Sequence, residues 1–214
     1  MPTKLDKREY RKIDAALMET RAAEDGAMVV EGYATTFNQP YELYKDSDMT
    51  VNEQVDRDAF AECDMSDVIM QYDHEGRVFA RIANGTLELK SDDHGLRIRA
   101  NLGGTEIGRQ LFEEIQGGYT NKMSFGFTVT GDERKVTRDA DGHIDVLRTI
   151  TKIGKLYDVS AVSLPANDAT EISARNTSDG LIAEVLEEVR AEEERQRRIG
   201  EIRKILKGEQ DHDE

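Results

Sequence analysis

Cysteine is almost absent from this sequence. Cys63 is the only one, so the chain cannot form an internal disulfide or a zinc site built on several thiolates. A single thiol fits a reducing compartment. A cysteine hydrolase with Cys63 as nucleophile is a poor hypothesis, because the surrounding segment CDMSD offers no paired histidine.

Long apolar runs are also missing. No stretch reaches the roughly 18 apolar residues that a membrane-spanning helix needs. The charged residues 1–11 are not followed by an apolar segment, so a secretory signal is not expected. We also find no internal repeat with a period of roughly 20–50 residues. The sequence therefore predicts a protein that acts in the cytoplasm where it is made, without a membrane partner.

Positive charge is in deficit. The chain has 29 Lys and Arg against 44 Asp and Glu, which gives a net charge of −15. A field of that sign repels phosphate backbones, so nucleic acid is not an expected partner. With 37% hydrophobic and 34% charged residues, the 214-residue chain can bury one core but must leave part of its length solvated.

What the sequence does contain is a series of short strand-like segments. They are rich in β-branched and aromatic residues or alternate apolar with polar positions, and they comprise residues 28–38, 67–72, 86–90, 95–101, 123–130, 144–153 and 156–164. An amphipathic helix is expected over residues 105–116, ended by two glycines. A short helical turn is expected over residues 56–63. The pattern predicts an α+β domain with about seven strands in a largely antiparallel sheet or barrel.

The composition changes near Asn176. Apolar residues from Leu181 to Val189 fall on one helical stripe, residues 190–198 carry almost only charge, and a stripe resumes at Ile199. We therefore predict a globular domain over residues 1–176 and a charged helical arm over residues 177–214. A solvated surface helix and a detachable, partner-binding arm are both compatible with this pattern.

Four histidines are present, and their contexts differ. His212 lies in the acidic tail, and His94 and His143 lie in the turn-like segments SDDHG and DADGH, where structural roles are favoured. His74 instead ends an apolar strand, so a rigid element would hold it at a rim. A structural role remains the commoner one for such a histidine. The segment DADGHID lacks the spacing and the final glutamate of a calcium loop, and we predict a hairpin turn there without a metal.

Ser124 and Asp158 are polar residues inside apolar strands. If the apolar neighbours of Ser124 in NKMSFGF face the core, alternation turns Ser124 to the opposite face, toward solvent or a cleft. A serine becomes nucleophilic only with a base in hydrogen-bond reach. Asp158, in LYDVS, is either an outward-facing acid or a buried partner that orients a histidine.

Taken together, these segments resemble the phage prohead protease family. The resemblance rests on EGYATTFN, VDRDAF, YDHEG, NKMSFGF and LYDVSAVSLPAN in that order and covers about residues 28–175. It implies that His74 and Ser124 are the catalytic pair. The family's usual motif is LYEVS, with glutamate where this chain has Asp158; we predict Asp158 as the third catalytic residue, and His94 and His143 stay as alternatives.

The resemblance also implies a fold and a function. The fold would be a β-barrel-like sheet flanked by helices, as in the related herpesvirus capsid proteases. The protein would be a serine endopeptidase without cofactor or metal. It would cleave scaffold and major capsid polypeptides, and also itself, inside an immature shell in the bacterial host, and it would self-associate. The alternative is a non-enzymatic capsid-assembly scaffold protein that keeps the fold, which the acidic charge and the helical C-terminus favour.

Overall fold

The computed structural model describes residues 8–13, 18–22, 27–163, 183–184, 187–192 and 194–203. The chain divides into two compact units, Met1–Glu171 and Ile172–Glu214, and each is considered by itself. The domain boundary predicted at Asn176 lies outside the described residues.

Eleven strands in the described part of the first unit form two sheets. The seven-stranded sheet comprises β1 (Glu9–Ile13), β4 (Tyr41–Lys45), β5 (Met49–Val55), β6 (Ile69–Tyr72), β7 (Glu75–Arg81), β10 (Lys122–Arg138) and β11 (Ile144–Val162). The four-stranded sheet comprises β2 (Glu19–Ala22), β3 (Met28–Thr36), β8 (Leu87–Ser91) and β9 (Gly95–Asn101). The strand order of the seven-stranded sheet is β1-β10-β11-β5-β4, and β6 pairs with β11 and β7 with β6. The strand order of the four-stranded sheet is β2-β3-β9-β8.

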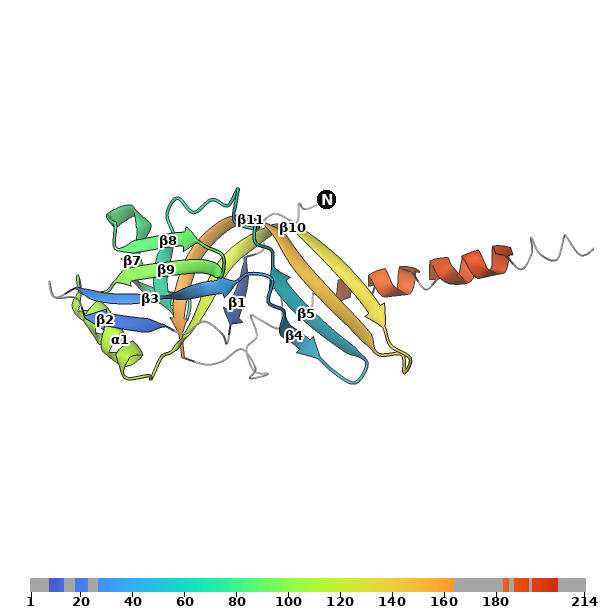
Figure 1. Cartoon of the computed structure of the whole chain (residues 1–214), viewed down its shortest axis with the longest axis horizontal. Coiled ribbons are helices and arrows are strands. Elements are labelled where there is room, and N and C mark those ends of the chain that lie inside the picture. Colours follow the sequence, from blue (N-terminus) through green and yellow to red (C-terminus); the bar gives the residue numbers. More distant parts are fainter. Residues whose placement is uncertain are drawn as a thin grey trace, which may run out of the picture. The chain divides into compact units, whose positions relative to one another are not determined.

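The long antiparallel hairpin β10–β11 lies in the middle of the larger sheet (Figure 1). Its turn lies at residues 139–143, where the Asp139 amide donates to the His143 carbonyl at 3.0 Å, so the hairpin predicted at DADGH is confirmed. The first part of β11 pairs in parallel with β5, and its last part pairs in parallel with β6. On the other edge of β10, β1 pairs antiparallel. β10 therefore lies between β1 and β11.

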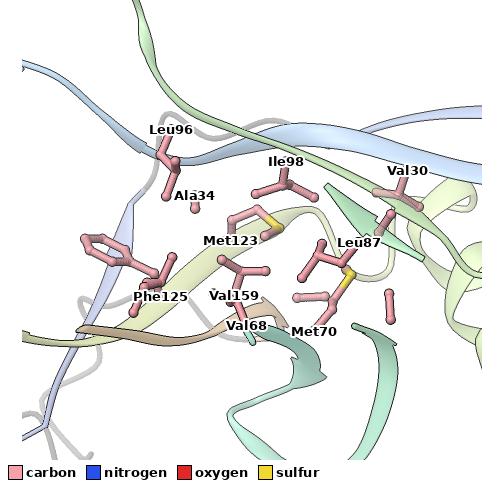
Figure 2. Close-up of a cluster of buried hydrophobic side chains, with 14 of the residues drawn as sticks. Val30, Ala34, Val68, Met70, Leu87, Leu96, Ile98, Met123, Phe125 and Val159 are labelled. Atoms are coloured by element: carbon pink, nitrogen blue, oxygen red, sulfur yellow. The ribbon is translucent and has the colours of Figure 1, made fainter. Parts of the chain in front are cut away.

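The core lies between the two sheets (Figure 2). Val30, Leu96 and Ile98 of the four-stranded sheet and Phe125 and Val159 of the larger sheet are all 0% exposed. Burying each such side chain contributes about 1.5–3 kcal/mol. The alternation in β10 follows from this burial, because the hydrophobic side of the strand faces the other sheet.

The helix predicted over residues 105–116 is confirmed as α1 (Glu106–Gln116). The Thr105 hydroxyl accepts from the Gly108 amide at 3.0 Å and caps its first turn. Leu111, Phe112 and Ile115 form its buried face. The segment predicted as a short helical turn at 56–63 forms turns, in which the Ala59 amide donates to the Asp56 carbonyl at 3.1 Å. A short 3-10 helix, η2 (Ile82–Asn84), follows β7.

The α+β class and the largely antiparallel pairing are confirmed, but the predicted barrel is wrong. The sheets are not closed on each other, and a single isolated bridge, Phe37 with Val55, joins them within the described residues. Eleven strands replace the expected seven or so, and α1 is the only α-helix in the described part of the first unit. Alternation predicts one buried face per strand, and a sandwich and a barrel satisfy it equally.

The second unit contains the predicted C-terminal helix. Residues 183–184, 187–192 and 194–203 are helical, with an ion pair between Arg198 and Glu194 at 2.8 Å, one turn apart. Its use as a partner-binding arm stays a prediction. In the described part of the chain, we find no helix with the length and hydrophobicity to cross a membrane.

Candidate active site

His74 lies in a two-residue turn that joins β6 to β7. Asp73 and His74 both have positive φ, 47° and 61°, as a type I′ hairpin turn requires. This backbone is uncommon for residues other than glycine and needs support from its surroundings. The Asp73 carboxylate supplies that support by accepting from the amide and hydroxyl of Ser163 at 3.1 and 2.8 Å. The turn is thereby fastened to the end of β11.

Ser124 is on the face of β10 that points away from the core. Its cross-strand partner on β11 is Ser160, and two residues along the strands Gly126 is opposite Asp158. Because side chains two apart share a face, Ser124, Asp158 and Ser160 lie together. The neighbouring Phe125 is 0% exposed on the opposite, core face.

Gly126 makes room for this arrangement. A Cβ at this position would lie 2.4 Å from Asp158 Oδ2 and 2.8 Å from the Tyr10 ring, closer than real contacts allow. The glycine of the MSFGF segment is thus explained by the close approach of Asp158 to the β10 backbone.

The three predicted site residues form one chain of contacts. Ser124 Oγ is 2.6 Å from His74 Nε2, and His74 Nδ1 is 2.5 Å from Asp158 Oδ1. Asp158 Oδ1 also accepts from the Ser160 hydroxyl at 2.9 Å. Asp158 is 1% exposed, and its Oδ2 is buried with no hydrogen-bond partner among the described residues. We call Ser124, His74 and Asp158 the Ser–His–Asp group.

This geometry can activate a hydroxyl. A histidine within 2.6 Å of a serine can take its proton, and a carboxylate on the other ring nitrogen holds the ring in place and stabilises the charged imidazole. The Ser124 hydroxyl also meets a second acceptor, the Arg11 carbonyl oxygen, at 2.8 Å. Ser124 is 0% exposed, and β1 pairs with β10 beside it.

A second buried polar group lies beside this site, and we call Glu9, Arg11, Tyr41, Glu53 and Arg148 the ion cluster. Glu53 is 0% exposed and receives Arg11 Nε at 2.5 Å, Arg148 Nη1 at 2.6 Å and the Tyr41 hydroxyl at 2.5 Å. Glu9 binds both arginines, accepting from Arg148 Nη1 at 3.0 Å.

The charges in the ion cluster set the pKa values of its members. Burial by itself would raise the pKa of Glu53, but the charge and hydrogen bonds of Arg11, with the charge of Arg148, outweigh it and lower that pKa. Burial, followed by the charge of Glu53, raises the pKa of Tyr41 well above its usual value. Glu53 therefore stays ionised and Tyr41 stays neutral.

The remaining sequence candidates have other contacts. His143 Nε2 is 2.9 Å from the Thr50 hydroxyl, and the His94 ring packs edge-on against Tyr33 at 4.6 Å between centroids. The two ring nitrogens of His74 contact Ser124 and Asp158 and neither of these histidines. His212 lies outside the described residues. Burial raises the pKa of the Cys63 thiol to about 11, which disfavours the thiolate that a cysteine hydrolase needs.

Sequence reasoning missed the residues that surround the site. Nothing in LYDVS marks the Ser160 side chain as a partner of Asp158, and Tyr10, Arg11, Glu53 and Arg148 come from segments that carry no motif. A charged residue in an alternating strand, as in the run Met49–Val55, was the one available signal for Glu53.

Comparison with known proteins identifies the family of the chain. A family model described as caudovirus prohead serine protease matches residues 16–183. The chain belongs to the caudovirus prohead serine protease family. Among solved structures, the capsid assembly protease of bacteriophage T4 is similar over 74% of this chain and 98% of its own, with 11% identity and a TM-score of 0.43. The comparison with curated proteins gave no match.

Proposed function

We propose that this protein is a serine endopeptidase that cleaves capsid and scaffold polypeptides, and also itself, inside an immature phage shell. Ser124 is the nucleophile, His74 the general base and Asp158 the residue that orients His74. The observation that carries the proposal is the unbroken chain of contacts from Ser124 Oγ through His74 to Asp158, with distances of 2.6 and 2.5 Å.

The mechanism follows from these contacts. Ser124 Oγ attacks the carbonyl carbon of the scissile bond while His74 Nε2 takes its proton, and His74 then gives that proton to the departing amine. A water molecule, activated by the same nitrogen, hydrolyses the acyl-enzyme and releases the new carboxylate. Asp158 keeps a proton on Nδ1, so that Nε2 is the nitrogen that accepts.

The direct test uses wild type, Ser124→Ala and, as a matched control, Ser91→Ala, which removes an exposed hydroxyl of β8. Each is expressed with capsid and scaffold polypeptides, and masses are followed over time. We expect new fragments with the wild type and Ser91→Ala, and intact substrates with Ser124→Ala. The self-cleavage and self-association of this chain are read from the same masses and from its oligomeric state.

The same experiment distinguishes the endopeptidase from the alternative, a non-enzymatic scaffold protein. If wild type and Ser124→Ala leave the same intact masses while both promote shell assembly, the protein acts as an assembly factor and the endopeptidase proposal is wrong.

A further inference from the structure

We propose that the edge of β10 beside Ser124 binds the substrate as an extended strand, in which an arginine provides the carbonyl group of the cleaved bond. We propose also that β1 occupies this edge as a built-in inhibitor. This inference rests on the proposed function, because it assigns the substrate side of the same site.

The pairing of β1 with β10 is the first observation. β1 runs antiparallel along β10 with Lys12 opposite Ser124 and Arg11 opposite Phe125, which is how an extended peptide adds to a sheet edge. Ser124 is 0% exposed and β1 occupies the edge of β10 beside it, so a substrate strand that pairs with this edge must replace β1. The family match begins at residue 16, so β1 precedes the matched segment, whereas Glu53, Ser124 and Arg148 lie within it.

The contacts of β1 block both reacting groups. The Ser124 hydroxyl has one proton, and while it is donated to the Arg11 carbonyl oxygen at 2.8 Å it is not donated to His74 Nε2. An acceptor oxygen thus engages the hydroxyl whose proton His74 must take. The Tyr10 ring covers His74, with 4.5 Å between the ring centroids. We infer that β1 holds the site in an inhibited arrangement.

The side chain of Arg11 indicates what a substrate offers in the same place. Both oxygens of Glu53 accept from it, Oε1 from Nε at 2.5 Å and Oε2 from Nη2 at 3.0 Å. Such a two-point contact suits arginine better than lysine. Tyr41 and Arg148 hold Glu53 independently of Arg11, so the acceptor for a substrate arginine is already in place. A substrate glutamate in the position of Arg11 would place a second buried negative charge beside Glu53.

The test compares full-length wild type with Arg11→Lys, Arg11→Glu and Arg21→Glu. The last makes the same charge change at an exposed site on β2. The readout is the rate at which a small serine-directed phosphonate labels Ser124. Since loss of a buried charge contact weakens docking strongly, we expect Arg11→Glu to be labelled on the order of 10²-fold faster than wild type. Arg11→Lys should lie between them, and Arg21→Glu should equal wild type.

A peptide added in trans tests the arginine preference. A synthetic peptide with the sequence of residues 8–13 should slow labelling of the Arg11→Glu protein, and the same peptide with glutamate in place of the arginine should not. Amide hydrogen exchange reports the fold, with fast exchange expected in β1 and wild-type protection in β3 and β9. If Arg11→Glu loses that protection, Arg11→Ala, which only removes the guanidinium, supplies the comparison.

The outcomes separate this inference from the proposed function. Equal labelling of Ser124 in wild type and in Arg11→Glu, with β1 amides exchanging faster, means that β1 does not inhibit, and it overturns the inference while the endopeptidase stands. If Ser124 is labelled in neither protein but the arginine peptide still binds in preference to the glutamate peptide, the endopeptidase proposal fails and the strand-binding site stands.

Discussion

The ion cluster and the Ser–His–Asp group are both buried and polar, and β1 contacts both, but they satisfy their hydrogen bonds differently. In the ion cluster, Glu53 accepts four hydrogen bonds from three side chains. In the Ser–His–Asp group, Asp158 Oδ2 has no partner among the described residues, and the proton of Ser124 has two acceptors to choose from. A saturated cluster favours one arrangement, whereas an under-satisfied one can exchange partners. Proton transfer needs a group of the second kind, in which a proton can change its hydrogen-bond partner.

The largest expected effect breaks the Ser–His–Asp group. Asp158→Asn should lower turnover on the order of 10⁴-fold, because the amide favours the wrong tautomer of His74. Stability should change little, since the side chain keeps its size. The measurement is the rate of capsid-polypeptide cleavage, with Asp145→Asn, an exposed residue of β11, as control. Unchanged activity in Asp158→Asn would remove Asp158 from the site.

The second prediction breaks the ion cluster. Glu53→Gln removes the most deeply buried carboxylate that Arg11 and Arg148 share and leaves them Glu9 as a common partner, and it should lower the free energy of unfolding by about 3–5 kcal/mol. Denaturant titration measures this, and Glu88→Gln, at an exposed carboxylate, should stay within about 0.5 kcal/mol of wild type. A neutral Glu53→Gln would show that the cluster does not hold β1 in place.

The third prediction concerns the room left by Gly126. Gly126→Ala should cost about 1–3 kcal/mol of stability, because its Cβ would overlap Asp158 and the Tyr10 ring. It should also lower turnover through the displacement of Asp158. Gly104→Ala is the matched control, because nothing lies within 4 Å of its Cβ position. If Gly126→Ala cleaves substrate at the wild-type rate, the close approach of Asp158 to the β10 backbone is not required for turnover.

The smallest expected effect is a pH dependence of the ion cluster. The pKa of Glu53 is lowered, so its contribution to stability is present above its unfolded pKa of about 4.3 and is lost as the pH falls. The pKa of Tyr41 is raised, so its contribution is present below about pH 10 and is lost as the pH rises.

Tyrosine absorbance measures the alkaline side, since the chain has seven tyrosines and no tryptophan. Tyr41 should ionise only as the protein unfolds, and Tyr41→Phe should remove that late component. Ionisation of all seven tyrosines below the unfolding transition would contradict the burial of Tyr41 against Glu53.

Much of the Ser–His–Asp group could be chosen from the sequence. Alternation in NKMSFGF separates Ser124 from its core-facing neighbours, and an acid inside an apolar strand singles out Asp158. The ion cluster could not be found in this way. Arg11 and Glu53 are 42 residues apart in the chain, and each looks like an ordinary exposed charge until the sheet brings them together.

The sequence by itself determined which faces are buried, the helix α1 and the β10–β11 turn, because these depend on local periodicity and on residue chemistry. Its resemblance to a family pointed to Ser124, His74 and Asp158 as candidate site residues. The tertiary structure alone decided that the sheets form an open sandwich, that β5 and β6 both pair with β11, and that β1 pairs with β10 beside Ser124. Strand pairing is a choice among edges that offer the same backbone donors and acceptors, so only the packing of the whole domain selects it.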